Sequence, residues 1–258
     1  MWASERQAKI LEILNTEKRV VTLDLVDLFD VSRETIRRDL LDMETAGALH
    51  RVHGGAICVD GGVATEPDFA VRLEAGAEYK AAIGAATCDL IGDGATVFVD
   101  AGTTTRAFAH QALRKGNLKF ITNSIEIAQM ASGSNAREVL LLGGRPHKDV
   151  PATYGELTLS EIDRFHADFA VLSPVGLHPT RGASYYELHE AEVARAMIRR
   201  SARCIMLCHS PKIGVESRVA VCRPEEIDHI VTDELADKSL RLPRGQVHFT
   251  SLASAVSG

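Results

Sequence analysis

The sequence contains no long apolar run and no N-terminal signal in which basic residues precede apolar ones. We therefore expect a cytoplasmic protein with no membrane partner. Its five cysteines are an odd number at irregular spacings, which argues against a disulfide framework. Aromatic residues make up only 5% of the chain and do not alternate with the basic groups, which argues against an RNA-binding scaffold.

The chain also lacks an excess of positive charge. Its formal net charge is −6, which argues against a protein that coats nucleic acid indiscriminately. A sequence-specific regulator whose positive charge is confined to one end remains compatible with this value. The length of 258 residues is enough for a small domain and a larger one with its own core.

The stretch from Val31 to Leu41 is predicted to form a short helix with an exposed basic face. Ser32 suits the N-cap position, because its hydroxyl can accept a hydrogen bond from a backbone N–H of the first turn. Apolar residues recur at helical spacing on one side: Ile36, Leu40 and Met43. Thr35, Arg37 and Arg38 lie outside that stripe. Arginine pairs with phosphates and can bind a guanine edge with two hydrogen bonds, so this face suits DNA.

The alternative is a solvated helix face on which the arginines pair with Glu34 and Asp39. The flanking residues favour DNA. Residues 4–15 and a short segment that starts at Thr22 have helical patterns, and a tight connection leads into the third helix, as in a helix-turn-helix. Residues 48–57 alternate around a Gly-Gly turn, as the β-hairpin of a wing would.

This N-terminal segment resembles the DNA-binding domain of the DeoR family of bacterial transcriptional repressors. The resemblance rests on Val31-Ser32, on Thr35 to Leu40 and on Arg51 to Ala56. It implies that the third helix enters the major groove and that the wing touches the flanking backbone or minor groove. The residues it assigns to DNA binding are Ser32, Arg33, Thr35, Arg37, Arg38, Arg51, His53 and Gly54.

The rest of the chain is predicted to be an α/β domain. Apolar strands are expected at 96–99, 119–121, 139–142, 169–172, 205–208, 229–231 and 247–249, and helices at 79–91, 103–114, 124–131 and 187–202. Continuous apolar strands that alternate with helices predict a mostly parallel sheet covered on both faces. We expect a winged helix-turn-helix domain at 1–57, a linker at 58–76 and the α/β domain at 77–258.

Polar or glycine-containing segments follow three of the predicted strands. They are Asp100 to Thr105, Thr122 to Ser124 and Gly143 to Arg145. Each alone is most simply a helix cap with a turn. Together they should meet at one edge of a parallel sheet, where ligands bind. Gly102 allows close approach, and backbone N–H groups at a helix start suit a phosphate. Lys212, after another strand, could add a cation.

The C-terminal part also resembles the DeoR family. The resemblance implies a fold similar to the sugar-phosphate isomerase and coenzyme A transferase fold, and a phosphorylated sugar or related metabolite as effector. The effector residues it suggests are Asp100, Gly102, Thr103, Thr104, Thr122, Asn123, Ser124, Gly143, Gly144, Asp168, Gly176 and Lys212. One departure is that His209-Ser210-Pro211 precedes Lys212, where the family usually has an Asp.

A metal site at Cys204, Cys208 and His209 is a weaker interpretation. These residues lie on or directly after a predicted buried strand, where a thiol mostly behaves as a small apolar group. We therefore expect no metal and no cofactor.

Two functions of different classes fit the sequence. The first is a repressor of sugar or polyol catabolism genes that leaves double-stranded operator DNA when its effector binds. It would be a homodimer or homotetramer, because one helix-turn-helix reads only a short half-site. The alternative is a sugar-phosphate isomerase or deaminase with an appended DNA-binding domain. Against an enzyme, Asp100 and Asp168 are the only plain acid–base candidates near one lysine.

Overall fold

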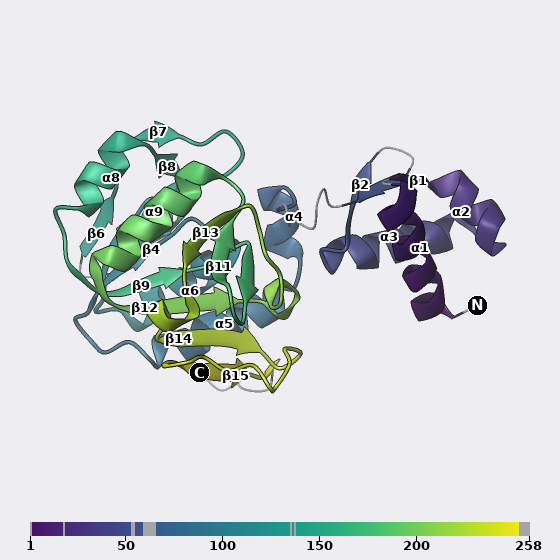
Figure 1. Ribbon diagram of the computed structural model, residues 1–258. Coiled ribbons are helices and arrows are strands. Elements are labelled where there is room, and N and C mark those ends of the chain that lie inside the picture. The colour runs from purple at the N-terminus through teal and green to yellow at the C-terminus, as the bar shows by residue number, and fades with distance from the viewer. Residues whose placement is uncertain are drawn as a thin grey trace. The chain divides into compact units, whose positions relative to one another are not determined.

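The computed structural model describes residues 2–17, 19–52, 55–58, 66–134, 136 and 138–252. The chain divides into two units, residues 1–65 and 66–258 (Figure 1). The second unit begins earlier than the sequence suggests, because residues 66–76 of the expected linker belong to it. A short helix, α4 (Phe69–Glu74), forms there.

The first unit has the predicted three helices and hairpin. Its elements are α1 (Ala3–Glu17), β1 (Arg19–Val21), α2 (Thr22–Phe29), α3 (Arg33–Thr45), β2 (Leu49–Val52) and β3 (Gly55–Cys58). Strand β1 was not expected; it pairs with β3 and completes a three-stranded antiparallel sheet in the order β1-β3-β2. The turn between α2 and α3 passes through Asp30, whose φ is 50°, a left-handed conformation that aspartate tolerates.

The core of this unit confirms the apolar stripe on the third helix. Ile36, Leu40 and Met43 are buried against side chains of α1, α2 and β2. The stripe also contains one charged residue, Asp39, which is 3% exposed. Asp39 accepts hydrogen bonds from the buried Arg6 of α1, with Arg6 Nε 2.5 Å from Oδ2 and a second guanidinium nitrogen 3.1 Å from Oδ1. This two-point ion pair joins the first helix to the third.

The second unit contains a sheet of seven parallel strands. Their order is β15-β14-β12-β9-β4-β5-β6, with β4 at Thr96–Val99, β5 at Lys119–Thr122, β6 at Glu138–Leu141, β9 at Ala167–Leu172, β12 at Ser201–Cys208, β14 at His229–Asp233 and β15 at Gln246–Thr250. Every one of these strands overlaps a predicted strand. The fold class predicted from the sequence is therefore confirmed.

Helices cover both faces of this sheet. Helices α5 (Ala77–Cys88), α6 (Thr103–Lys115) and α7 (Ile125–Ser132) pack on the face formed by alternate strand residues such as Val97, Val99 and Val171. Helix α9 (Leu188–Arg199) packs on the opposite face against β9 and β12, with α8 (Glu156–Ile162) beside it. Gly84 allows α5 to lie close to α6, because a Cβ there would be 2.7 Å from the backbone nitrogen of Phe108.

Several short elements at the carboxyl edge of the sheet were not predicted. Strands β7 (Arg145–Pro146) and β8 (Thr153–Tyr154) form a small hairpin. Strands β10 (Gly176–His178), β11 (Gly182–Tyr185) and β13 (Val219–Cys222) form a separate antiparallel sheet that contacts α9. These elements are too short to have a clear period in the sequence.

The buried strands hold the cysteines that suggested a metal. Cys204 and Cys208 lie in the core on β12, and burial raises the pKa of the Cys208 thiol to about 12. Within the described ranges, no group of three His, Cys, Asp or Glu side chains is placed to hold a metal ion.

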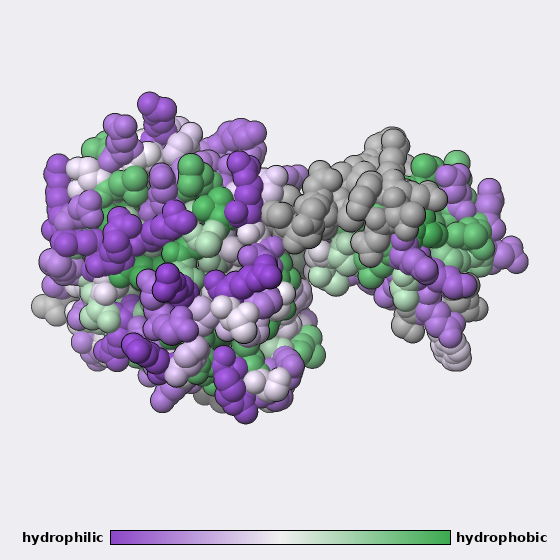
Figure 2. Space-filling model, viewed as in Figure 1, coloured by the Kyte–Doolittle hydropathy of each residue, from purple (hydrophilic) through white to green (hydrophobic). Residues whose placement is uncertain are grey.

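The visible surface of the second unit is mostly hydrophilic (Figure 2). Apolar areas appear over α8 and α9, and the exposed large apolar side chains of the chain include Leu157 and Leu188. None of the helices in the part of the chain that the structure describes is long and apolar enough to span a membrane.

Replacing Asp39 with Ala should destabilise the first unit by about 3 kcal/mol, because a buried guanidinium loses its two-point partner. Amide hydrogen exchange across α1 and α3 measures the opening free energy of this unit separately from the second. Asp42→Ala, at an exposed position on the same helix, is the matched control and should change it by less than about 0.5 kcal/mol. Equal protection in the two variants would mean that the ion pair contributes nothing to stability.

Candidate functional site

The third helix presents a polar face to solvent at its N-terminal end. Ser32 caps the helix as predicted, because its hydroxyl accepts a hydrogen bond from the Thr35 backbone N–H at 3.1 Å. Arg33, Arg37 and Arg38 are exposed. The solvated-face alternative required Asp39 to pair with these arginines. Asp39 instead pairs with Arg6. Among the described residues, one of these arginines forms an ion pair: Arg37 lies 3.5 Å from Glu34, and both side chains are mostly in solvent.

The wing is only partly described. Arg51 of β2 forms an ion pair with Glu44 of α3, with 2.6 Å between Arg51 Nε and Glu44 Oε2, and its backbone N–H donates to the same carboxylate. This contact attaches the wing to the third helix. His53 and Gly54, the other wing residues predicted to bind DNA, lie outside the described residues.

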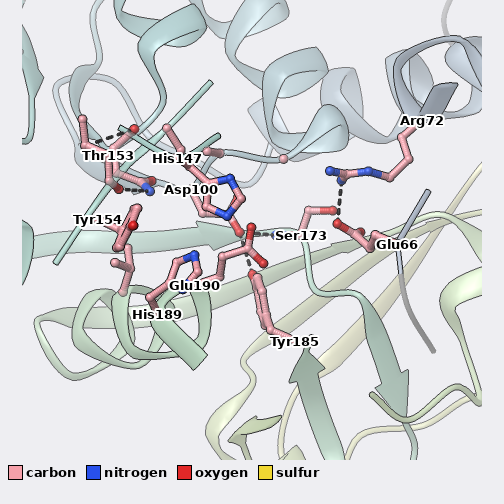
Figure 3. A pocket seen from close by; sticks show the side chains of 15 residues that line it. Glu66, Arg72, Asp100, His147, Thr153, Tyr154, Ser173, Tyr185, His189 and Glu190 are labelled. Atoms are coloured by element: carbon pink, nitrogen blue, oxygen red, sulfur yellow. Dashed lines mark hydrogen bonds and ion pairs between the residues drawn. The ribbon is translucent and has the colours of Figure 1, made fainter. Parts of the chain in front are cut away.

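A pocket lies at the carboxyl edge of the parallel sheet in the second unit (Figure 3). Its walls come from the ends of β4, β5 and β9, from the β7–β8 hairpin, from β11, from the start of α9 and from residues around α4. The lining residues are Glu66, Arg72, Asp100, Ala101, Gly102, Asn123, His147, Ala152, Thr153, Tyr154, Ser173, Tyr185, His189, Glu190 and Val193. Charged and aromatic side chains from segments far apart in the sequence therefore meet at one place.

Asp100 is held in place through one of its two carboxylate oxygens. Its Oδ2 accepts hydrogen bonds from the Tyr185 hydroxyl at 2.6 Å and from the Ser173 backbone N–H at 3.0 Å. Its Oδ1 is buried and has no hydrogen-bond partner among the described residues. Burial raises the pKa of Asp100, and the hydrogen bonds from Tyr185 and Ser173 counteract part of that rise. Burial, together with the charge of Asp100, also raises the pKa of Tyr185 well above its usual value.

One side of the pocket holds an ion-pair cluster. Glu66 lies 2.7 Å from an Arg72 guanidinium nitrogen and 2.8 Å from Lys212 Nζ. Lys212 therefore does not line the pocket as a free cation, since it lies behind Glu66. Burial works to raise the pKa of Glu66, but the charges of Lys212 and Arg72 outweigh it and hold that pKa below its usual value.

The other side of the pocket is aromatic. The rings of His147, Tyr154 and His189 are grouped there, with 4.3 Å between the centroids of Tyr154 and His189 and 4.9 Å between those of the two histidines (Figure 3). His147 Nδ1 accepts hydrogen bonds from the backbone N–H groups of Asp149 and Val150. Burial, and then the neighbouring His189, lowers the pKa of His147, so its ring is neutral at pH 7.

Glu190 is a carboxyl group of the pocket whose pKa is strongly raised. Burial is the main cause that raises its pKa to about 7, and the negative charges of Glu66 and Asp100 add to the rise. The pocket thus carries one carboxylate that changes its charge near physiological pH.

The structure separates the predicted effector residues into three groups. Asp100, Gly102 and Asn123 line the pocket. A second group is buried but does not line the pocket: Thr103, Thr104, Thr122 and Ser124. The Thr122 hydroxyl donates to the Val99 carbonyl at 2.7 Å, and Ser124 caps α7 through the Ile127 N–H.

The remaining predicted residues lie elsewhere. Asp168 is a correction: it stands at the amino end of β9, at the edge opposite the pocket, and accepts a hydrogen bond from the Thr96 backbone N–H at 2.8 Å. Gly143 and Gly144 form the turn into β7 and do not line the pocket. Gly144 has a φ of 143°, and a Cβ there would be 2.2 Å from the Thr158 hydroxyl.

Gly176 is also structural, because it allows β10 to approach the Val215 carbonyl, which a Cβ would meet at 2.6 Å. His209, at the departure from the family pattern, stacks on Tyr79 with 5.7 Å between ring centroids and does not line the pocket.

Most of the pocket's charged and aromatic side chains were missed by sequence reasoning. Tyr185, His147 and Tyr154 belong to short hairpins without a period, and Glu66 lies in the segment that looked like a linker.

Family models match both units. The DeoR-like helix-turn-helix domain matches residues 6–61, and the DeoR C terminal sensor domain matches residues 76–234. The HTH-type transcriptional repressor GlcR of Bacillus subtilis is 33% identical over 239 residues, which cover 93% of this chain and 92% of that protein. The glycerol-3-phosphate regulon repressor of Escherichia coli is 30% identical over 233 residues, which cover 90% of this chain and 92% of that protein.

Among solved structures, ribose 5-phosphate isomerase A from Methanocaldococcus jannaschii is similar to 52% of this chain and 53% of its own, with a TM-score of 0.38 and 13% identity. The matches to full-length repressors extend through both units. The chain belongs to the DeoR family of transcriptional regulators.

Proposed function

We propose that this protein represses sugar or polyol catabolism genes and leaves its operator when a phosphorylated sugar or related metabolite binds the pocket of the second unit. It acts in the cytoplasm as a homodimer or homotetramer, since two helix-turn-helix units in register give typical operator affinity. The observation that carries the proposal is a capped helix with exposed arginines in a chain that also holds a polar pocket at the sheet edge.

The free arginine face supports DNA binding. Asp39 is neutralised inside the fold by Arg6, so the carboxylate next to Arg38 does not reduce the charge available to a phosphate. The Arg37–Glu34 pair is exposed, and such pairs are worth little, so DNA can replace Glu34 at small cost.

Unpaired polar atoms support a ligand in the pocket. Asp100 Oδ1, Asn123 Oδ1 and His189 Nε2 are buried without a hydrogen-bond partner among the described residues, and all three residues line this pocket. Buried polar atoms are usually paired, so these three suit the hydroxyl groups of a sugar or polyol. Gly102 stands directly before α6, where backbone N–H groups favour a phosphate.

The alternative function is that of an isomerase or deaminase, which would need an acid–base pair in the pocket. The sequence offered Asp100 and Asp168 as acid–base candidates, but Asp168 accepts a hydrogen bond from the Thr96 backbone N–H at the opposite edge of the sheet, so the two do not form a pair in the pocket. Relatives that match almost the whole chain are named as repressors. We therefore propose that the protein has no catalytic activity. A panel of sugar phosphates incubated with the protein, with turnover as the readout, tests this directly.

Arg37→Ala and Arg38→Ala should each weaken binding to an operator selected from random DNA. The loss should be about 1–3 kcal/mol for an arginine that reads a base. An arginine that contacts only phosphate should instead reduce the slope of log affinity against log salt by about one. Titrations at several salt concentrations distinguish the two. Arg114→Ala, which removes an exposed arginine from the second unit, should change neither quantity. If both helix variants behave like this control, the third helix does not contact DNA.

Gly102→Val should abolish effector binding and leave operator binding intact. A Cβ at this position would be 3.0 Å from Ser173 Cβ and 3.0 Å from the Thr105 hydroxyl, so the larger side chain has to project into the pocket. The variant should act as a repressor that no longer responds, because a ligand shifts an equilibrium only by its differential affinity.

Calorimetry with the sugar phosphate that gives the largest thermal shift, next to operator binding with and without it, measures both properties. Gly92→Val is the control, since a Cβ at Gly92 meets nothing within 4 Å. Normal ligand binding and normal operator release by Gly102→Val would place the sensor elsewhere.

Glu190 should make binding of an anionic effector depend on pH. Below its pKa of about 7 Glu190 is neutral, and above it the carboxylate repels a phosphate. Glu190→Gln is neutral at every pH. The wild-type protein should therefore bind the same ligand as tightly as the variant at pH 6, but about fivefold more weakly at pH 8, if the ligand raises the pKa of Glu190 by about one unit. Comparing the two proteins at each pH cancels the titration of the ligand. A ratio of affinities that is constant between pH 6 and pH 8 would rule out this role.

A further inference from the structure

Two basic side chains, Arg72 in the pocket wall and Lys212 behind Glu66, are already bound to a carboxylate of the chain itself. Glu66 places Oε1 2.8 Å from Lys212 Nζ and Oε2 2.7 Å from the Arg72 guanidinium. All three side chains are at most one-fifth exposed. Glu66 and Arg72 line the same pocket as Asp100 and Gly102, so this ion pair forms part of its wall and lies where a ligand would bind (Figure 3).

Both basic groups are held in place by backbone carbonyls as well as by Glu66. Lys212 Nζ also donates to the Pro174 carbonyl at 2.8 Å, and Arg72 Nε donates to the Pro67 carbonyl at 2.9 Å. A rotation of the Glu66 side chain alone would therefore leave a lysine and an arginine fixed in position. Two fixed cations at the border of a pocket are an anion-binding arrangement, since a phosphate oxygen can replace each carboxylate oxygen.

The surrounding charges make an unoccupied cation cluster unfavourable. Lys80 is 5% exposed and donates to the Arg72 carbonyl. Burial, and then the charges of Lys212 and Arg72, lowers the pKa of Lys80 to about 8. Three basic groups thus lie near Glu66, and the pocket needs an anion at this position, whether Glu66 or a ligand supplies it.

We infer that Glu66 is an internal competitor that fills the anion subsite of Arg72 and Lys212 until a phosphate monoester displaces it. This inference rests on the proposed function, which it deepens by naming the cations and the competitor. Glu66 then determines specificity. A neutral sugar or polyol cannot replace its charge between two cations, whereas a phosphate dianion can.

The test is a calorimetric titration of the full chain with inorganic phosphate at pH 6, where Glu66 is ionised and Glu190, with a pKa of about 7, is mostly neutral. Glu66→Gln removes the competitor and keeps the shape of the side chain, so the variant should bind phosphate roughly tenfold or more tightly than the wild type, the ratio expected when a charge-assisted hydrogen bond need not be broken. The double variant Glu66→Gln/Arg72→Gln should lose that gain, because the guanidinium is the group that the variant sets free.

Glu190→Gln is the matched control. It replaces a carboxyl group of the same pocket by an amide, but on a side chain that forms no ion pair with Arg72 or Lys212 among the described residues. A gain for Glu66→Gln well above that for Glu190→Gln supports direct competition. Equal gains in the two variants, or no gain in a Glu66→Gln protein with a normal melting curve, would overturn it.

Glu66→Asp provides the test if the Gln variant does not fold. Its carboxylate keeps the charge but is one methylene shorter, so phosphate should again bind more tightly than to the wild type, and equal affinity would overturn the inference.

No DNA is present in these titrations. A failure of sugar phosphates to release the operator would therefore refute the proposed function alone, while unchanged phosphate binding in the Glu66 variants would refute only the competitor.

Discussion

The parallel alignment of seven strands is the constraint on which the second unit depends. A parallel sheet needs helices on both faces, and those helices leave its carboxyl edge as the place where loops and helix starts meet. Asp100 follows β4 near the middle of the sheet and Asn123 follows the neighbouring β5. The two strands are neighbours in the sheet, so their ends lie side by side, although helix α6 stands between them in the sequence.

Burial of charge at this edge has an energetic cost that the structure only partly offsets. One oxygen of Asp100 accepts hydrogen bonds from Tyr185 and Ser173, and the other has no partner in the part of the chain that the structure describes. The Glu66 cluster is satisfied on every side by lysine, arginine and backbone carbonyls. On one side of the pocket the charged groups are all paired, whereas polar atoms elsewhere in it lack hydrogen-bond partners within the described ranges. A ligand gains most binding energy by hydrogen bonding to the unpaired atoms, and it has to displace Glu66 to reach the paired cations.

The sequence is sufficient to predict the strands and the residues that follow them directly, and it is insufficient for the rest of the site. Asp100, Gly102 and Asn123 follow strands with clear apolar patterns, so their edge could be assigned. Tyr185 and His147 belong to hairpins too short for a period to appear. Asp168 was misplaced although its position was readable: it precedes the predicted strand 169–172, and a residue before a parallel strand lies at the edge away from the ligand.

In the first unit, sequence neighbours alone do not show which charged residues pair with each other. Asp39 lies next to Arg38 in sequence, and proximity alone suggests that it neutralises the basic face. Its position three residues after Ile36 instead puts it on the apolar stripe, where a carboxylate needs a buried partner, and Arg6 is that partner. The same spacing leaves Arg37 and Arg38 off the stripe and in solvent. A charged residue on the stripe therefore indicates internal pairing, and one off the stripe is available to another molecule.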